Sequence, residues 1–476
     1  MQHTNQQVKS SLLWSAIDSF GHKLIGVAIT LILANILGPS DYGLVAMLTI
    51  FIAIADVFVN SGFNSALIRK TDRSEKDYST TFYFSLVVSL VAYGLLFISA
   101  PLIARFYEQP ELVKLTRVIA LTIIINGLAI IPRTKLTISL NFKSQAKANI
   151  TALIFGGFIG LIMAFNGFGV WSLVSQQLVF AGISSLMLNL LCPWCPREAF
   201  CKESFKELFG FGSKLLASGL LDTIYNNLYG LIIGKQFSAA QLGVFNQAKT
   251  LSLLPAGTIT SVIQKVTYPM LSAMQGDSEK LDNAYLKSLR VSCLIIFPIM
   301  FGLCISAEPL ISLLLGEKWQ ESAPLISILT MGFVLYPIQV INLNMLQVKG
   351  RSDLFLKLEI IKKINLTIML FITVPIGIKA ICVGMVVTSY LALIINTYYT
   401  AKLSTITQLR QLSALFPIGI ITAISAAIGY QLGSGVMENW LSLITMLTTA
   451  LLSYLILMVI FQQSLIIEVK TLLKGA

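Results

Sequence analysis

The segment SAIDSFGHKLIGVAITLILANIL, residues 15–37, decides the fold class of this chain. It holds about 23 residues, enough to cross a hydrocarbon core ~30 Å thick at 1.5 Å per residue. It also carries Asp18, His22 and Lys23 within one short stretch. A charge at the centre of a bilayer costs at least ~2.5 kcal/mol, so such groups usually face a protein interior or a watery cavity. The segment therefore predicts a membrane helix with a functional polar face.

The composition extends this prediction to the whole chain. The 476 residues are 55% hydrophobic and 12% charged, whereas soluble proteins are roughly 25% charged. We expect an all-α polytopic membrane protein with about fourteen transmembrane helices. The apolar runs that predict them are 15–37, 44–67, 80–104, 113–131, 150–166, 170–191, 213–234, 245–271, 289–308, 323–348, 355–377, 380–401, 412–433 and 440–461.

Lys and Arg residues are distributed unevenly between the two sides that this count predicts. Most of the 34 fall on the side of the termini, as in the connections 68–79 and 192–214. The segment 132–149 belongs to the same side and is predicted to be an interfacial helix with a basic face. Because cytoplasmic loops are enriched in Lys and Arg, both termini are predicted to be cytoplasmic. The net charge of +12 then reflects a basic inner surface that faces anionic membrane lipids, with no need for a nucleic acid partner.

The chain contains an internal repeat. LLWSAIDSFGHKLIG, from Leu12, matches LLASGLLDTIYNNLYG, from Leu215, and Gly43 and Gly243 end equivalent turns 200 residues apart. Six spans per copy give both copies the same orientation, so substrate is expected between two lobes, as in other repeat-built transporters. The predicted parts are an N-terminal six-helix lobe at 1–191, an inter-lobe cytoplasmic loop at 192–212, a C-terminal six-helix lobe at 213–401, and two additional helices with a cytoplasmic tail at 402–476.

Polar residues recur three or four apart on the first two spans of each copy and therefore share one helix face. Such stripes predict a central polar cavity, although pairing of Asp18 with Lys23, or Asn and Gln acting as interhelical contacts, would explain individual residues. Lysines suit a phosphate or an acidic sugar, and carboxylates in a half-dry cavity suit a proton or sodium ion. The substrate-binding candidates are Lys23, His22, Asn60, Asn226, Lys249, Gln264 and Lys265, and the ion-coupling candidates are Asp18, Asp56 and Asp222.

Signatures of an enzyme are missing from the sequence. It has no GxxxxGK[ST] nucleotide loop, and no segment outside the predicted spans is long enough for a catalytic domain. The cluster Cys192, Cys195 and Cys201 lacks a fourth ligand nearby, so incidental cysteines are favoured over a zinc site. We expect a transporter without a metal or another cofactor. A membrane-embedded glycosyltransferase or polymerase would need a larger extramembrane loop than 192–214.

Seven short motifs together resemble the polysaccharide transporter family of the multidrug/oligosaccharidyl-lipid/polysaccharide (MOP) flippase superfamily. The resemblance is to Wzx-type exporters of colanic acid, teichuronic acid and lipopolysaccharide repeat units, and it runs from about residue 10 to about residue 400. The motifs are LANILGPSDYGLVAM, NSGFNSALI, APLIARFY, GFGVWSLVSQQ, LGVFNQAKTLSLLP, YPMLS and LLLGEKWQESAPLISIL.

The resemblance implies two six-helix lobes around a central cavity, as in multidrug (MATE) transporters of the superfamily. It implies that the protein moves an undecaprenyl-pyrophosphate-linked oligosaccharide across the bacterial inner membrane, coupled to an ion gradient and upstream of a polysaccharide polymerase. A superfamily member with another amphipathic cargo, such as a drug antiporter or a peptidoglycan-precursor flippase, is the alternative. The sugar, the coupling ion and the oligomeric state do not follow from the sequence.

Overall fold

The computed structural model of the chain describes residues 5–60 and 62–463, with the side chains of 5–13, 15–20, 22 and 352 outside the described part. The described residues form helices and no strands, as predicted. They fall into two compact units, Met1–Gly243 and Val244–Ala476, and the boundary lies inside helix α11, Ala239–Ala273. The lobe boundaries expected from the repeat stay a prediction.

The helices of the first unit precede α11 in the chain. They are α1 Asn5–Ile36, α2 Pro39–Asn60, α3 Phe63–Arg69, α4 Glu75–Tyr107, α5 Leu112–Ile119, α6 Leu121–Leu128, α7 Ile130–Ile138, α8 Phe142–Phe165, α9 Val170–Leu191 and α10 Lys202–Gln236. The second unit continues with α12 Ser278–Ile305, α13 Ala307–Leu314, the 3-10 turn η1 Glu317–Trp319, α14 Ser322–Phe333, α15 Tyr336–Val348, α16 Ser352–Thr373, α17 Ile378–Leu403, α18 Gln408–Ser434 and α19 Asn439–Phe461.

Nine helices in the described part of the chain are long and apolar enough to cross a membrane, and a tenth span results if Leu112–Leu128 and Ile130–Ile138, which meet at a 45° bend, are counted together. Large apolar side chains on these helices point outward, such as Leu95, Ile98 and Leu102 of α4, with exposed fractions of 63%, 76% and 66%. Such exposed apolar surface suits lipid contact. The protein is therefore a multi-pass membrane protein, while the number of fourteen helices stays a prediction.

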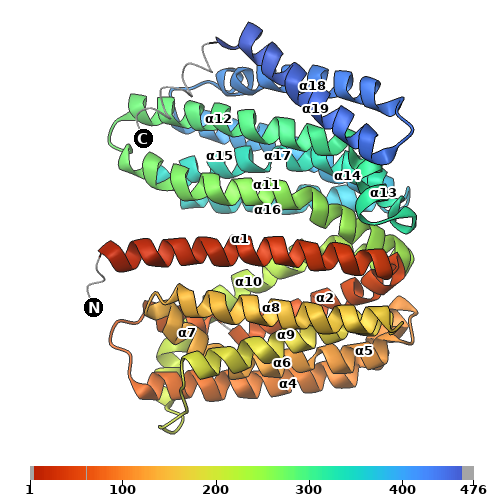
Figure 1. The fold of residues 1–476 in the computed structure, drawn as a ribbon. Helices are drawn as coiled ribbons and strands as arrows, with labels where there is room; N and C mark the ends of the chain where they lie inside the picture. The colour runs from red at the N-terminus through yellow and green to blue at the C-terminus, as the bar shows by residue number, and fades with distance from the viewer. Residues whose placement is uncertain (1–4, 61, 464–476) are drawn as a thin grey trace. The chain divides into compact units, whose positions relative to one another are not determined.

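Within the first unit, α8 packs against both α1 and α9, and α4 packs against α5 and α6 (Figure 1). Ile29 and Leu33 of α1 meet Leu153 of α8 and Leu173 of α9 in one apolar cluster. Small residues on α8, among them Gly156 and Gly160, lie against the backbone of α9 and let the two helices approach closely. This packing explains how α1 is held despite its polar N-terminal half.

The second unit has its own core. The helices α12, α15 and α18 surround an apolar cluster that includes Leu289, Ile296, Ile338, Met345 and Ile418. Within it, the buried Tyr285 hydroxyl lies 2.8 Å from Oδ1 of Asn342 and 2.8 Å from Oε1 of Gln411, so a polar network fixes one end of the unit. Helices α18 and α19, predicted as additional spans, pack against α12 and belong to this unit.

The two turns marked by the repeat meet within the first unit. A Cβ atom at Gly43 would overlap the backbone of Ala239, and a Cβ atom at Gly243 would overlap the carbonyl of Pro39. The start of α2 and the start of α11 therefore pack backbone to backbone, each through the glycine that ends its own turn. The two glycines, 200 residues apart in the sequence, thus each lie against the backbone of the other's helix start.

Candidate functional site

Three long helices in the described part of the chain are too polar to count among the nine apolar spans: α10, α11 and α16. The described part of α1, Lys23–Ile36, is a shorter apolar helix. The helices α10 and α11 have 35 residues each, and α16 has 22. At 1.5 Å per residue, each is at least ~33 Å long and can cross a hydrocarbon core. Two of the three, α10 and α11, carry stripes that the sequence predicted. Long helices with polar faces are the ones expected to border a watery path.

In the first unit, Lys23, Asn60, Asp222 and Asn226 are exposed. The Asn60 amide donates to the backbone carbonyl of Asp56 at 2.9 Å, so these two residues adjoin on α2. Lys23, Asp222 and Asn226 each have an interaction partner. The side chains of Asp18 and His22 lie outside the described residues, which leaves their predicted roles untested.

In the second unit, Lys249 is half-buried and has an interaction partner. Gln264 and Lys265 are exposed further along the same helix, α11. That all the candidate residues line one cavity stays a prediction, as does each role assigned to them.

Asp56 lies in a charged cluster that was not predicted from the sequence. The side chain of Asn126, on α6, hydrogen-bonds to the Asp56 carboxylate, and Arg133, on α7, lies within electrostatic range. The Thr134 hydroxyl donates to the side-chain oxygen of Asn64. The 45° bend between α6 and α7 brings the α7 residues to this cluster. A carboxylate beside a guanidinium can hold both a cation and an anionic group.

The segment 132–149, predicted to be one interfacial helix, is divided between two helices, and its location at the interface stays a prediction. Helix α7 ends at Ile138 and α8 begins at Phe142, and Arg133 lies in the interior of α7. Pro132 and Arg133 look like a break because proline ends many helices and arginine is rare in membrane spans. The informative signal was Asn126, a polar residue inside the apolar run 121–131.

A second missed cluster lies in the second unit, on α16. The Lys362 ammonium pairs with the Glu359 carboxylate at 3.0 Å, and the two side chains are 19% and 33% exposed. Lys362 borders a cavity of about 210 Å³ that Gln339, Tyr336 and Ser389 also line. The Gln339 amide donates to the Ser389 hydroxyl at 2.9 Å. Because Glu and Lys three apart on a helix neutralise each other, their charges can be accommodated in a span.

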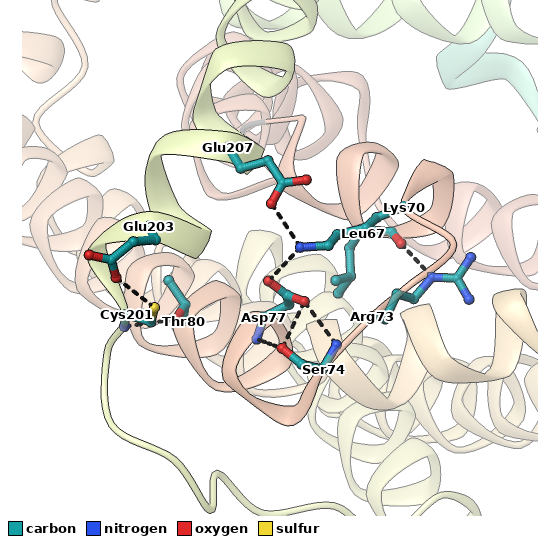
Figure 2. Close-up of polar contacts among 9 residues, drawn as sticks. All are labelled: Leu67, Lys70, Arg73, Ser74, Asp77, Thr80, Cys201, Glu203 and Glu207. Carbon is teal, nitrogen blue, oxygen red and sulfur yellow. Dashed lines mark hydrogen bonds and ion pairs between the residues drawn. The ribbon is translucent and has the colours of Figure 1, made fainter.

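An ion-pair cluster closes one end of the first unit, where α3, α4 and α10 meet (Figure 2). The Lys70 ammonium lies 3.1 Å from the buried Asp77 carboxylate and 2.8 Å from Glu207 of α10. The hydrogen bond with Glu207 raises the pKa of Lys70 above its ordinary value, so the residue stays charged. Lys70 thus links the start of α10 to the connection between α3 and α4.

Capping interactions within RKTDRSEKD, residues 69–77, hold the side chains of this cluster in place. Ser74 and Asp77 form a capping box that starts α4, while the Arg73 guanidinium donates to the carbonyls of Leu67 and Ile68 at the end of α3, both at 2.7 Å. The backbone N–H of Cys201 donates to the Thr80 hydroxyl at 3.0 Å. The connection before α10 is therefore attached to the first turns of α4, as Figure 2 shows for Cys201 and Thr80.

Replacing Lys70 with methionine should destabilise the first unit by about 1–3 kcal/mol, because the buried Asp77 carboxylate loses its cationic partner. Thermal unfolding of the purified variant in detergent measures this. The matched control is Lys76→Met, which removes an exposed lysine from the same segment and should leave unfolding unchanged. Equal unfolding of both variants would show that the Lys70 bridges add nothing to stability.

The described residues contain no group of three or more His, Cys, Asp and Glu side chains suited to a metal ion. Cys195 is exposed, and the Cys201 thiol lies 3.1 Å from the Glu203 carboxylate (Figure 2). Within the described part of the chain, the three cysteines of the connection therefore have no metal-binding arrangement around them.

Comparison with known proteins assigns the chain to a family. The family profile described as "Polysaccharide biosynthesis protein" matches residues 32–324. The teichuronic acid biosynthesis protein TuaB of Bacillus subtilis (strain 168) is 24% identical over 356 residues, which are 74% of each chain. The succinoglycan biosynthesis transport protein ExoT of Rhizobium meliloti (strain 1021) is 26% identical over 67% of this chain and 64% of that protein. The lipopolysaccharide biosynthesis protein WzxC of Escherichia coli (strain K12) is 23% identical over 74% of this chain and 72% of that protein.

Solved structures share the fold. The lipid II flippase MurJ in an inward closed conformation has a TM-score of 0.79 at 15% identity, over 96% of this chain and 100% of that chain. An inward-facing MATE multidrug transporter of the MOP superfamily has a TM-score of 0.64 at 17% identity, over 85% and 98%. Both likenesses concern the fold alone. They confirm, with the family match, the resemblance that the seven motifs indicated: the chain belongs to the polysaccharide biosynthesis protein family and has the all-helical fold of the MOP transporters.

Proposed function

We propose that this protein is a flippase that moves undecaprenyl-pyrophosphate-linked oligosaccharide repeat units across the bacterial inner membrane, for exopolysaccharide or lipopolysaccharide biosynthesis. The observation that carries the proposal is a family match over more than half of the chain, combined with a fold shared with a lipid-linked precursor flippase. The names of the relatives support the cargo class, because they refer to teichuronic acid, succinoglycan and lipopolysaccharide. The protein acts as a transporter and not as an enzyme.

In the proposed mechanism, polar helix faces receive the sugars and the pyrophosphate, while the polyprenyl tail stays in lipid. Lys23, Lys249 and Lys265 attract the pyrophosphate, and Arg133 adds a guanidinium that can bind it in a bidentate manner. His22, Asn60, Asn226 and Gln264 supply hydrogen bonds to sugar hydroxyls. Alternation between inward-open and outward-open states then moves the head group, and no covalent step is required.

Coupling to a proton or sodium gradient is assigned to Asp18, Asp56 and Asp222. The environment of Asp56 supports its inclusion, because Arg133 and Asn126 both interact with the carboxylate. Binding of a cation there would compete with the guanidinium of Arg133, and Arg133 would be released for the anionic cargo. One site could thus exchange an ion for a substrate.

The membrane arrangement completes the proposal. We place about fourteen helices in the inner membrane as two six-helix lobes plus two helices, with both termini in the cytoplasm. The polybasic connections on that side contact anionic lipid head groups. The product leaves on the periplasmic side, where a polysaccharide polymerase consumes it.

A second candidate is a transporter of another amphipathic cargo. The likeness to MurJ and to MATE transporters supports it, since these share the fold and differ in cargo. Expression in cells that lack one transporter each, for a polysaccharide repeat unit, for lipid II or for drug efflux, separates the alternatives by the pathway that the protein restores.

Leaflet-resolved accessibility of a fluorescent polyprenyl-pyrophosphate oligosaccharide in proteoliposomes tests the function. We expect wild-type protein to translocate it in response to an imposed ion gradient, and Lys23→Ala and Asp18→Asn each to slow translocation at least tenfold, since one removes a phosphate contact and the other a coupling carboxylate. The control is Lys379→Ala, which removes an exposed lysine from the first turn of α17.

Translocation that survives both substitutions at the wild-type rate would show that Asp18 and Lys23 have a structural role. Wild-type protein that moves no polyprenyl-linked oligosaccharide, but restores drug efflux, would replace the proposed cargo with that of the second candidate.

A further inference from the structure

An open cavity of about 580 Å³ lies in the first unit, at the end of α4 opposite to Lys70. It is formed by the first turn of α2, by the connection between α4 and α5 with the start of α5, and by the connection between α8 and α9 with the start of α9. Its volume is within the range of about 300–1,000 Å³ that is usual for small-molecule sites. The side chains that give it its character are Asp41, Glu111, Lys114, Phe168 and Trp171.

Its position relative to the membrane follows from the length of α4. This helix has 33 residues and runs from Glu75, beside the Lys70 cluster, to Tyr107, beside the cavity. At 1.5 Å per residue the two ends are separated by about 50 Å, more than the thickness of the hydrocarbon core. The Lys70 end carries the Lys- and Arg-rich connections that mark the cytoplasmic side. The cavity is therefore at the exit side of the proposed transport direction.

A turn with two glycines, between α8 and α9, forms part of this cavity. Gly167 and Gly169 have positive φ angles of 79° and 55°, which glycine adopts far more readily than other residues. A Cβ atom at Gly169 would lie 3.3 Å from Oδ1 of Asp41, so the turn lies close to that carboxylate. Oδ2 of Asp41 accepts a hydrogen bond from the backbone N–H of Gly38 at 3.0 Å, which fixes the orientation of the side chain.

Aromatic rings line the cavity together with polar groups that are still able to form hydrogen bonds with a ligand. Phe168 is 55% exposed, and Trp171 is half-buried. In the described part of the chain, neither Glu111 nor Lys114 takes part in an ion pair or a side-chain hydrogen bond. Two carboxylates against one ammonium group repel an anion, so the cavity disfavours a pyrophosphate. Carboxylates and an amine instead accept from and donate to hydroxyl groups.

We propose that this cavity binds a neutral saccharide of the repeat unit on the exit side, an assignment that rests on the proposed function. A pyranose ring has an apolar C–H face and a rim of hydroxyls. The cavity has aromatic rings that suit the first and polar side chains that suit the second. Trp171 and Phe168 pack against the C–H face, while Asp41, Glu111 and Lys114 bind the hydroxyls. The site holds the sugars after the pyrophosphate has left its cationic contacts, and it thereby disfavours return of the head group.

Binding of the free oligosaccharide tests the assignment. The probe is the repeat-unit oligosaccharide released by mild acid from the carrier lipid of the host, added to detergent-solubilised protein and followed by saturation-transfer-difference NMR. We expect Trp171→Ala and Glu111→Gln each to weaken binding at least tenfold. The control is Trp440→Ala, which removes an exposed tryptophan at the start of α19, away from the residues that line this cavity. If Trp171→Ala does not fold, Phe168→Ala replaces it.

Wild-type affinity in the Glu111→Gln variant and in the aromatic variant would overturn the assignment, even if translocation in proteoliposomes is intact. Calcium binding that Glu111→Gln removes, without any oligosaccharide signal, would overturn it in favour of a cation site. Failure of wild-type translocation overturns the proposed function instead, because the binding measurement uses no lipid carrier and no gradient.

Discussion

Replacing Gly43 with alanine should lower the free energy of unfolding by about 3 kcal/mol, at the upper end of the usual cost of overpacking. The added methyl group would overlap the backbone of Ala239. A flexible side chain can rotate away from such a contact, but a backbone can yield only if α2 and α11 separate. Thermal unfolding in detergent and the yield of monodisperse protein both measure the effect.

Two further substitutions make this prediction specific. Gly94 lies in the interior of α4, and no atom lies within 4 Å of the position that an added methyl group would occupy, so Gly94→Ala should be neutral or stabilising by up to about 1 kcal/mol through helix propensity. Gly243→Ala should cost as much as Gly43→Ala, since its methyl would overlap Pro39. A destabilised Gly94→Ala protein, or a stable Gly43→Ala protein, would contradict the reciprocal contact.

The double variant Gly43→Ala/Gly243→Ala tests whether the contact is one unit. Separating the two helices to relieve one overlap also relieves the other, so the combined cost should be clearly smaller than the sum of the single costs. Residues in direct contact typically show such coupling, whereas distant sites add. Additive costs would mean that the two glycines act independently.

These glycines also show what the sequence could predict. The repeated layout identified Gly43 and Gly243 as equivalent, but that they touch follows only from the fold. Apolar runs predicted the bounds of a helix well where no charged residue interrupts them: 170–191 and 440–461 match α9 and α19 almost residue for residue. A continuous run of side chains suited to lipid has few alternatives to a transmembrane helix.

Prediction from the sequence was weakest where charges lie inside membrane helices. Arg133 falls in the predicted interfacial helix outside the spans, and Lys362 with Glu359 is not selected at all, because a charged residue by itself indicates the end of a span. The cost of such a charge depends on its partners, such as Asp56 for Arg133, and partners on other helices are set by tertiary packing. The polar stripes of α1, α10 and α11 were recognisable because their helical spacing is local.

Replacing Asp56 with asparagine should reduce gradient-driven translocation at least 30-fold with little change in stability. Arg133 is exposed and Asp56 is half-buried, so their attraction is worth only about 1 kcal/mol to folding. The transport cycle depends on the charge more strongly, because asparagine cannot exchange a proton or bind a sodium ion as a carboxylate does. Proteoliposome translocation and thermal unfolding, measured on the same preparation, separate the two effects.

The double variant Asp56→Asn/Arg133→Gln distinguishes a transport role from a structural pair. If the two residues only neutralise each other, removing both charges restores translocation. If Asp56 binds the coupling ion and Arg133 the cargo, as we propose, the double variant stays at least as slow as either single variant. Arg117→Gln is the matched control, since Arg117 stacks over Phe97 at 4.3 Å, away from the Asp56 cluster, and its loss should leave the rate unchanged. Recovery in the double variant would therefore remove Asp56 from the coupling path.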